Sequence, residues 1–325
     1  MNTTANGSNL WVCSSLINVS ALKIGQTIGY SLILGFSLFG NSIIGLTVYK
    51  TPKLRKPINY LIANMAISDM LLPFFTIPLR LSAEIHSGGS WPTGGLLGQA
   101  LCKLAIYFTH VSFGVSSQSL VLIALDRYVA VVFPLRSPFI SRKLFPFFIL
   151  ATWVVALAFF APYMIVAKVD EGTQGTVCYF DWYGTFEGSW PIENHYITVY
   201  TAFSFIPAVL LVILYSIILI KLKLQAPPGE ELTNATKQRE RKNRNVLRMA
   251  IAIVLAFFFC TVPITTTNLI MVRQPVDSSI WSSCGFWLFA ELAHLIFNAN
   301  CAINPLICLT FSNNYRQGLK RLLKC

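Results

Sequence analysis

Charged residues are scarce in this chain of 325 residues. Only 12% of its residues are charged and 54% are hydrophobic, with a mean hydropathy of +0.60, whereas soluble domains carry about 25% charged residues. The sequence also has no internal repeats and no low-complexity segment, which argues against a repeat array and a disordered chain. What remains is one domain that lies within a membrane.

Seven apolar runs fill most of the chain, and each is long enough for the roughly 20 residues that a helix needs to cross a bilayer. The runs occupy 26–49, 58–82, 100–132, 143–167, 192–222, 246–272 and 284–310. The sequence therefore predicts an all-α membrane protein, a seven-transmembrane helix bundle. After the seventh run, apolar and basic residues at helical spacing predict a short C-terminal amphipathic helix. We expect an N-terminal tail at 1–25, the transmembrane domain at 26–310 and a cytoplasmic amphipathic helix at 311–325.

The cationic residues predict how the bundle is oriented, because short loops rich in Lys and Arg stay cytoplasmic. Only five of the 25 cationic residues fall on the side of the N-terminus: Lys23, Arg80, Lys103, Lys168 and Arg273. We therefore expect a multi-pass protein of the plasma membrane with an extracellular N-terminus. The net charge of +12 then reflects contact with anionic lipid, and no nucleic-acid partner is expected.

The N-terminal tail fits an extracellular location. Asn2, Asn6 and Asn18 each stand in an Asn-x-Ser/Thr sequence and are predicted glycosylation sites. The first ten residues, "MNTTANGSNL", are polar and lack the basic start and apolar core of a cleavable signal peptide. We therefore expect the first helix to target the chain to the membrane.

Two pairs of cysteines are predicted on the extracellular side, where disulfides form. Cys102 begins the third apolar run and Cys178 lies in the loop at 168–191, so a disulfide between them would tie the loop to the helix. A second disulfide, between Cys13 and Cys284, would join the tail to the third extracellular loop if their geometry allows it. Cys325, at the end of the amphipathic helix, is a candidate for palmitoylation, with an unmodified thiol as the alternative.

Asp69 is an acid deep inside the second apolar run, about 16 Å along the helix from its start. An acid near the bilayer centre costs about 2.5–3.5 kcal/mol, so it indicates a functional site. Ser116, Asn300 and Asn304 on other runs offer polar partners. Oxygen ligands around a carboxylate suit a hard cation, so a bound sodium ion is one prediction for this site. A polar core or a water cluster without an ion is the alternative.

An acid and a base stand side by side in the otherwise apolar stretch "SLVLIALDRYVAVVF". Because adjacent residues of a helix point about 100° apart, we expect Asp126 and Arg127 to make separate contacts at the cytoplasmic end of the helix and not to form one salt bridge. If the cytoplasmic helix ends part, Arg127 would face the C-terminus of a partner's helix, which carries a negative dipole.

At these residues the sequence resembles the rhodopsin-like, or class A, G-protein-coupled receptors, and in particular the peptide-receptor branch. The resemblance spans the whole chain. It is carried by Gly40 and Asn41, "NMAISD" ending at Asp69, Trp91, Cys102, "DRYVAVVFP" from Asp126 to Pro134, Trp153, Cys178, Pro207, Tyr215, Phe257, "CTVP" from Cys260 to Pro263, and "NPLIC" from Asn304 to Cys308. The resemblance implies a receptor that binds an extracellular ligand and activates a heterotrimeric G protein.

The resemblance also implies which residues couple ligand binding to the G protein. Arg127 would lock the resting bundle through Asp126, and would contact the G protein once the sixth helix swings outward. The full set of predicted switch residues is Asp126, Arg127, Tyr128, Tyr215, Phe257, Pro263, Asn304 and Pro305.

Three positions depart from the family pattern. Thr261 stands where the family usually has the Trp that transmits ligand contact to the sixth helix. Cys308 stands where the family usually has the Tyr that pairs with the position of Tyr215. Asn243 replaces the acid that many relatives place opposite Arg127, so we expect any resting lock to depend on the neighbouring acid alone.

The pocket that the resemblance implies fits neither an amine nor retinal. Thr109 stands where amine receptors carry Asp, and Asn298 stands where opsins carry the Lys that binds retinal. By family position, the ligand-binding residues are Thr109, His110, Phe113, Thr265, Asn268, Glu291, His294 and Asn298. Aromatic and amide groups around one acid suit a small peptide, so we expect a neuropeptide receptor. The excess of acids on the extracellular side favours a cationic peptide.

Other functions remain as alternatives. A non-signalling or constitutively active receptor-like protein is suggested by Thr261 and Cys308. A secondary transporter has less support, because it would show internal symmetry and paired discontinuous helices. An enzyme is not expected, since the sequence contains neither a His-Glu-x-x-His nor a Gly-x-Ser-x-Gly motif.

Overall fold

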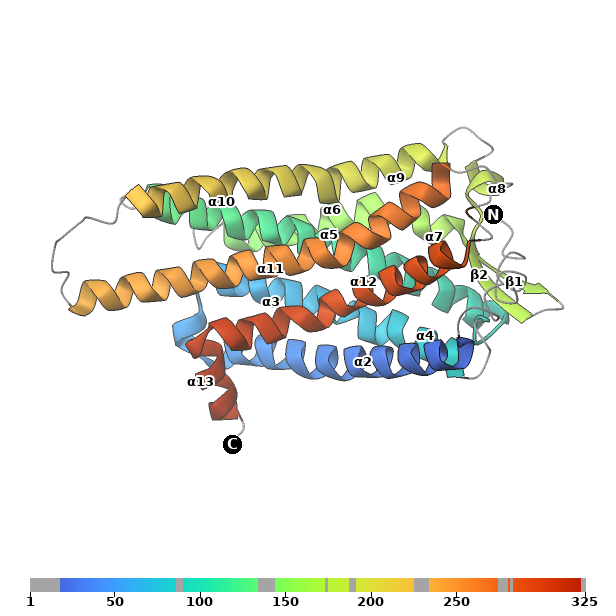
Figure 1. Ribbon diagram of the computed structural model, residues 1–325, viewed down its shortest axis with the longest axis horizontal. Coiled ribbons are helices and arrows are strands. Elements are labelled where there is room, and N and C mark those ends of the chain that lie inside the picture. Colours follow the sequence, from blue (N-terminus) through green and yellow to red (C-terminus); the bar gives the residue numbers. More distant parts are fainter. Residues whose placement is uncertain are drawn as a thin grey trace.

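The structure, a computed structural model, describes residues 18–85, 90–133, 144–172, 175–186, 191–224, 234–273, 280 and 283–322. Among these residues, seven helical segments are long and apolar enough to cross a membrane: Ser20–Lys50, Pro57–Ile85, Gly95–Val132, Phe145–Val166, Ile192–Leu222, Arg244–Arg273 and Cys284–Phe311. They lie side by side in one bundle (Figure 1). The predicted all-α, seven-helix fold is therefore confirmed.

Several of the spans are built from more than one element. In chain order the elements are α2 (Val19–Lys50), η1 (Pro52–Leu54), α3 (Pro57–Asp69), η2 (Leu72–Thr76), α4 (Ile77–Ile85), α5 (Gly95–Val132), α6 (Phe145–Phe160), α7 (Pro162–Val166), β1 (Ala167–Gly172), β2 (Gly175–Phe180), α8 (Trp182–Phe186), α9 (Ile192–Tyr200), η3 (Thr201–Phe205), α10 (Ile206–Leu224), α11 (Asn234–Arg273), α12 (Cys284–Phe311) and α13 (Asn313–Leu322).

Prolines account for the breaks within the spans, because a proline has no N–H and the carbonyl four residues earlier loses its helical donor. Pro162 begins α7 directly after α6, Pro73 lies in the π-helical turn η2, and Pro207 follows the π-helical turn η3. The carbonyl that Pro207 leaves without its usual donor belongs to Phe203, and the Ser117 hydroxyl of α5 donates to it at 2.6 Å. A neighbouring helix thus supplies the missing donor.

At another proline break, α2 supplies the missing hydrogen-bond donor. Pro305 lies inside α12, so the Cys301 carbonyl lacks its helical donor, and the Asn41 side-chain amide donates to this carbonyl at 2.8 Å. Gly40 allows the close approach, because a Cβ at this position would lie 2.7 Å from Pro305 Cβ. Gly40 and Asn41 therefore hold α2 against α12 at the point where α12 is broken.

The two ends of the bundle differ in structure. At one end, here called the hairpin end, β1 and β2 pair antiparallel, with Ala167 opposite Phe180. A disulfide joins Cys102, near the start of α5, to Cys178 in β2, which confirms the predicted pairing. At the other end, here called the α13 end, α13 turns away from the direction of the bundle (Figure 1). The β-hairpin was not expected from the sequence.

Side chains fasten the hairpin to the start of α5. Gln99 bonds it twice: its Nε2 donates to the Ala167 carbonyl at 2.8 Å, and its Oε1 accepts from the Val169 N–H at 2.9 Å. Glu171 of β1 accepts from the Gly95 N–H at 2.5 Å, and Gly95 has a φ of +63°, which glycine adopts without strain. Hydrogen bonds therefore hold the hairpin in addition to the disulfide.

The predicted C-terminal amphipathic helix is present as α13, and it packs against the bundle. The Tyr315 side chain is buried, and its hydroxyl donates to Asn59 Oδ1 of α3 at 3.3 Å. Burial raises the pKa of Tyr315 well above its usual value. Gly318 faces Thr47 of α2, where a Cβ would meet the Thr47 methyl group. The apolar face of α13 is thus docked on α2 and α3.

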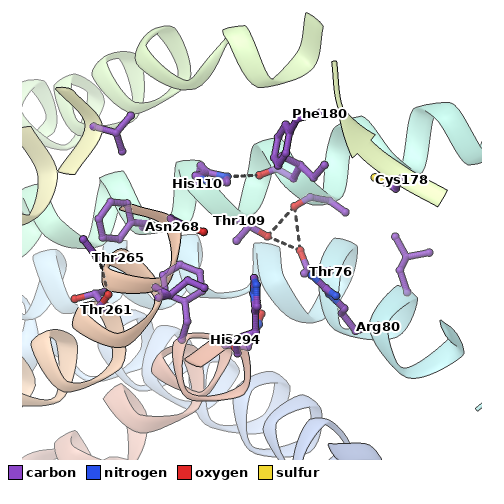
Figure 2. Close-up of a pocket in the computed structure, with 18 of the residues that line it drawn as sticks. Thr76, Arg80, Thr109, His110, Cys178, Phe180, Thr261, Thr265, Asn268 and His294 are labelled. Atoms are coloured by element: carbon purple, nitrogen blue, oxygen red, sulfur yellow. Dashed lines mark hydrogen bonds between the residues drawn. The ribbon is translucent and has the colours of Figure 1, made fainter. Parts of the chain in front are cut away.

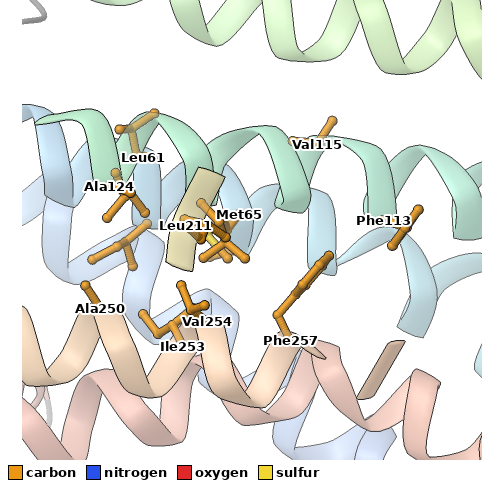
Figure 3. Packing of buried hydrophobic residues seen from close by; sticks show 14 of the residues in the cluster. Leu61, Met65, Phe113, Val115, Ala124, Leu211, Ala250, Ile253, Val254 and Phe257 are labelled. Atoms are coloured by element: carbon orange, nitrogen blue, oxygen red, sulfur yellow. The ribbon is translucent and has the colours of Figure 1, made fainter. Parts of the chain in front are cut away.

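An apolar core joins α3, α5, α10 and α11 (Figure 3). Leu61 and Met65 from α3, Leu211 from α10 and Phe257 from α11 are all buried in it. Large apolar side chains such as Phe259 are exposed on the outside of the bundle, where lipid tails would surround them. Polar side chains are also buried inside the bundle, as expected of a protein that is surrounded by lipid.

The predicted modification sites are only partly described. Asn18 caps α2, its side-chain oxygen accepting from the Ala21 N–H at 3.0 Å, and this leaves the amide nitrogen, to which a glycan attaches, unused by the cap. Cys284 is disulfide-bonded. Its predicted partner and three other predicted sites lie outside the described residues: Cys13, Asn2, Asn6 and Cys325. Glycosylation and palmitoylation therefore stay predictions.

Candidate functional site

A cavity of about 320 Å³ lies inside the bundle, next to the hairpin. Its walls come from η2, α4, α5, α9, α11 and α12, and β2 borders it through Val177, Cys178 and Phe180 (Figure 2). Ligand sites in proteins range over about 300–1,000 Å³, so this cavity is at the small end. It has room for a small molecule or for one end of a larger one.

Most of the residues that the resemblance implies for ligand binding line this cavity: Thr109, His110, Phe113, Thr265, Asn268, His294 and Asn298. Glu291 is not one of the lining residues, and its carboxylate accepts from the Gln26 amide of α2 at 2.8 Å. Among the described residues that line the cavity, Arg80 is the only one with a formal charge. Arg80 is not among the binding residues that the resemblance implies, although it follows the lining residue Thr76 by four positions.

The lining threonines are already hydrogen-bonded within the protein. The hydroxyl oxygens of Thr76 and Thr109 lie 2.7 Å apart, and both hydroxyls reach the Ala105 carbonyl, at 3.1 and 2.7 Å. Thr261 and Thr265 each donate to the carbonyl one turn earlier, at 2.8 Å. A hydroxyl whose hydrogen is used in this way offers a ligand only its lone pairs. These four side chains are therefore hydrogen-bond acceptors for anything in the cavity.

Two asparagines of the lining are held by single contacts. Asn298 Nδ2 donates to the His294 carbonyl at 2.8 Å, and Asn268 Nδ2 donates to the Tyr200 hydroxyl at 2.5 Å. Asn298 Oδ1 is buried and has no partner within the part of the chain that the structure describes. A buried acceptor without a partner costs about 1–3 kcal/mol, so Asn298 Oδ1 is an unsatisfied polar atom behind the cavity wall.

His110 is both a lining residue and a packing residue. Its ring stacks on Tyr163 of α7 with centroids 4.1 Å apart and an interplanar angle of 19°. Its Nδ1 lies 2.8 Å from the Ile106 carbonyl. The ring is thus fixed between α5 and α7, and forms a rigid part of the cavity wall.

An ion pair supports the hairpin outside the membrane spans. Lys168 Nζ of β1 lies 2.5 Å from the Asp181 carboxylate, which also accepts from the Gly184 N–H at 3.1 Å. The hydrogen bond from Lys168 holds the pKa of Asp181 below its usual value, and the same bond raises the pKa of Lys168. Both groups are therefore charged at neutral pH, and they fasten β1 to the segment that follows β2.

Asp69 lies in a polar core in the middle of the bundle. Its Oδ2 accepts from Asn304 Nδ2 at 2.8 Å, and its Oδ1 accepts from Ser116 and Ser112 at 3.3 and 3.5 Å. The structure thus brings Ser116 and Asn304 to Asp69, and adds Ser112, one turn before Ser116 on α5. Asn300 is buried, but its Oδ1 has no partner among the described residues. The carboxylate and the two serine hydroxyl oxygens are ligands that a hard cation accepts, whereas Asn304 presents its amide nitrogen to Asp69.

Phe113 connects the cavity to α11. Its ring lies parallel to that of Phe257, with centroids 5.8 Å apart and an interplanar angle of 6°. Phe257 is buried one turn before Thr261, and Pro263 lies inside the same helix two residues later. Thr261 takes the position where the resemblance leads one to expect Trp, so the two phenylalanines provide the ring contact between the cavity wall and α11.

Asp126 and Arg127 form an ion pair at the α13 end of α5. Arg127 Nη2 and Nε lie 2.5 and 3.2 Å from Asp126 Oδ2. The prediction that the two residues make separate contacts is therefore wrong. The Arg127 side chain is long enough to fold back onto Asp126, although adjacent Cβ atoms point apart. Tyr128, the next residue, packs edge-on against Phe133 at 6.0 Å. The side chain of Asn243 lies outside the described residues.

The Tyr215 hydroxyl on α10 is buried and, in the described ranges of the chain, has no hydrogen-bond partner. Cys308 of α12, where the resemblance leads one to expect the Tyr that pairs with this hydroxyl, is also buried. Together with Asn304 and Pro305, Cys308 borders a void of about 10 Å³, which is at the lower limit for holding one water molecule.

Comparisons with known proteins agree with this architecture. Residues 40–307 match the family described as 7 transmembrane receptor (rhodopsin family). The chain is 31% identical to the RYamide receptor of Drosophila melanogaster, over 90% of this chain and 62% of that protein. It is 28% identical to the Allatostatin-A receptor of Bombyx mori, over 89% and 76%, and 26% identical to the somatostatin receptor type 5 of Rattus norvegicus, over 99% and 84%. The chain thus spans just under two thirds of the Drosophila receptor.

Proposed function

Because this chain belongs to the rhodopsin family of seven-transmembrane receptors, which are not enzymes, we propose that it binds a small extracellular peptide and then activates a heterotrimeric G protein. The observation that carries the proposal is the placement of three features on one helix, α5. Phe113 lines the cavity, Ser116 contacts the polar core, and Arg127 lies at the α13 end. One continuous helix, Gly95–Val132, therefore joins the ligand site to the partner site.

The relatives and the cavity both support a peptide as the ligand. The similar receptors are named for RYamide, Allatostatin-A and somatostatin. The cavity lining mixes aromatic rings with threonine and asparagine side chains, which suits the hydrogen-bonding backbone of a peptide. A volume of about 320 Å³ holds only one end of such a peptide, so the rest would contact the hairpin.

Ligand binding is transmitted through the contact between Phe113 and Phe257. A ligand that presses on the cavity wall shifts this ring pair, and the shift moves α11 relative to α5. Separation of the two helices at the α13 end exposes Arg127, which leaves Asp126 and interacts with the negative C-terminal dipole of a helix of the G protein. The ligand favours this open arrangement only as far as it binds it more tightly than the closed one.

The polar core would hold a sodium ion in the closed arrangement. Asp69, Ser112, Ser116 and Asn304 would be its protein ligands, and the ion would offset the charge of the buried carboxylate and favour the state that keeps these oxygens together. Peptide affinity measured over a range of sodium concentrations tests this role. Asp69→Asn should abolish the dependence, whereas a wild-type affinity that ignores sodium would favour a water cluster at this site.

The hairpin end faces the outside of the cell, and the α13 end faces the cytoplasm. The distribution of Lys and Arg supports this orientation, and so does the Cys102–Cys178 disulfide at the hairpin end, since disulfides form on the oxidising side. Antibody labelling of an N-terminal tag at the plasma membrane of intact cells tests this orientation. Labelling that requires permeabilised cells would contradict the orientation and the receptor function with it.

Arg127→Ala tests the coupling to a G protein. Cells that carry the receptor and a promiscuous G protein are screened with peptide pools, and nucleotide exchange is measured with the active pool. Exchange should be lost in Arg127→Ala at unchanged surface expression, and retained in the control Arg55→Ala, which removes a cation that donates to the Tyr49 carbonyl at 3.1 Å. Unchanged exchange in Arg127→Ala would refute the proposed role.

A non-signalling or constitutively active receptor-like protein is the second candidate function. It is favoured by the absence of the expected Trp at Thr261 and by the unpartnered Tyr215 hydroxyl in the described structure. This candidate predicts either no exchange with any peptide pool or the same high exchange with and without peptide. Peptide-dependent exchange in the wild type would exclude both forms of it.

A further inference from the structure

We propose that the cavity takes a carboxylate group of the ligand and that Arg80 binds it. This inference rests on the proposed peptide-receptor function and adds the chemical class of the end that enters the cavity. It differs from the sequence-based expectation of a cationic peptide, which relied on the excess of acids on the extracellular side.

Arg80 is placed to act as a ligand-binding cation. It lies one turn after Thr76, on the wall of the cavity formed by η2 and α4 (Figure 2). Its side chain is exposed, and in the residues that the structure describes it makes neither a hydrogen bond nor an ion pair. A guanidinium presents a planar fork of N–H donors that matches the two oxygens of a carboxylate.

No acidic side chain competes for this position inside the cavity, as far as the described lining goes. The charges of Glu84 and Glu291 act on each other, and those of Lys23 and Arg80 act on Glu84, so this group of four has no net charge. Glu291 is also bonded to Gln26 at 2.8 Å. Within the described lining, an anionic ligand group therefore meets a counter-charge and a cationic group meets none, because Glu84, the acid on which the charge of Arg80 acts, is not a lining residue.

The remaining polar lining complements Arg80 instead of duplicating it. The four lining threonines use their hydroxyl hydrogens on backbone carbonyls or, for Thr76 and Thr109, on each other, so they do not supply donors for a carboxylate. Asn298 also lines the cavity, but its Oδ1 is enclosed and is not open to a ligand there.

Two parts of a peptide provide this chemistry: the free C-terminus, and the side chain of Asp or Glu. Both would be bound by the same guanidinium. The cavity holds only one end of a peptide, so the two sources predict different peptides to be active. An experiment with matched pools separates them.

The probes are three pools of synthetic tetrapeptides. The first pool has a free C-terminal carboxylate and no Asp or Glu, the second has the same sequences with a C-terminal amide, and the third has the amide and one Asp or Glu in every peptide. Each pool is titrated against the purified full-length protein in lipid nanodiscs. The readout is the shift of the thermal unfolding midpoint, which reports binding without a G protein.

For the wild type we expect the first or the third pool to bind at least about tenfold more tightly than the second, since hydrogen bonds to charged groups are about twice as strong as neutral ones. The advantage should vanish in Arg80→Gln and persist in part in Arg80→Lys, which keeps the charge. Glu291→Gln, which removes a nearby negative charge, should increase the advantage. The unfolding midpoint without peptide shows whether each variant is folded.

Equal or tighter binding of the neutral amide pool by the wild type would overturn the carboxylate proposal and leave the peptide-receptor function standing. A carboxylate advantage that survives Arg80→Gln would overturn the assignment to Arg80. Binding by none of the pools would contradict the peptide-receptor function itself, and the carboxylate proposal with it. An advantage of the third pool alone assigns the carboxylate to a side chain, and an advantage of the first assigns it to the C-terminus.

Discussion

Ser117→Ala is expected to destabilise the bundle, because the Ser117 hydroxyl donates to a backbone carbonyl that has lost its helical donor. Pro207 has no N–H, and the Phe203 carbonyl accepts from Ser117 Oγ at 2.6 Å. Ser117 is completely buried, so bulk water has no access to the hydroxyl that the substitution removes.

The size of the effect follows from what the carbonyl loses. Hydrogen bonds between helices in membranes contribute about 0.6 kcal/mol on average and at most about 1.7 kcal/mol, whereas an unsatisfied buried acceptor costs about 1–3 kcal/mol. Because Pro207 removes the helical donor of Phe203, we expect Ser117→Ala to fall in the range where these estimates overlap. The free energy of unfolding should drop by about 1–1.7 kcal/mol.

A double-mutant cycle tests whether the missing N–H of Pro207 causes this loss of stability, in addition to how large the loss is. Pro207→Ala restores an N–H that reaches the Phe203 carbonyl within the helix, so Ser117→Ala should then cost less, by more than the roughly 0.5 kcal/mol scatter of independent sites. The assay is reversible unfolding by SDS in bicelles. The matched control is Ser204→Ala, since the neighbouring Ser204 hydroxyl is buried and unpartnered in the described residues. Equal costs of Ser117→Ala with and without Pro207→Ala would refute the reasoning.

Two further predictions concern the α2–α12 contact and the hairpin. Gly40→Ala should lower the free energy of unfolding by about 1–3 kcal/mol, because the new Cβ would lie 2.7 Å from Pro305 Cβ. The control Gly35→Ala should be neutral, because a Cβ there meets nothing within 4 Å. Equal unfolding free energies of the two variants would contradict the contact. The Lys168–Asp181 pair lowers the pKa of Asp181, so its stabilisation is present above the ordinary Asp pKa of about 3.9 and is lost as pH falls through the lowered value. The protection of the hairpin amides from hydrogen exchange, relative to their intrinsic exchange rates, should therefore fall below about pH 4, and an Asp181→Asn protein with the same acid response would rule this out.

The seven spans could be predicted because length and apolar composition alone decide whether a helix crosses a bilayer. The run at 58–82, for example, corresponds to Pro57–Ile85 in the structure. Composition does not show how the helix is wound inside the run. The π-helical turns at Leu72–Thr76 and Thr201–Phe205 lie next to prolines, and the second turn also uses the donor that Ser117 supplies from α5, a contact that the sequence does not show.

The hairpin could not be predicted because its strands are held by contacts distant in the sequence. The segment "AKVDEG" pairs with "GTVCYF", and neither shows the alternation of a strand with one buried face. An isolated two-stranded hairpin is marginally stable in water. Here Gln99, Glu171 and the Cys102–Cys178 disulfide fix it, and only the disulfide could be expected from the sequence.

The site was partly predictable, and the misses share one cause. Thr109 and Asn298 line the cavity as their family positions predicted, because the backbone places them there. Long charged side chains behave less predictably, because their direction depends on neighbours. Glu291 turns to Gln26 and not to the cavity, Arg127 folds back onto the preceding acid, and Arg80 reaches the cavity wall.

The central claim is that ligand binding at the hairpin end opens the bundle between α5 and α11 at the α13 end. Spin labels at Ala130→Cys and Arg248→Cys, both exposed positions at that end, measure the separation of the two helices in nanodiscs. Cys260, Cys301 and Cys308 are buried and should stay unlabelled. With an active peptide pool and nucleotide-free G protein, the account predicts a new population at longer distance. A distance distribution identical to that of the protein alone would contradict it.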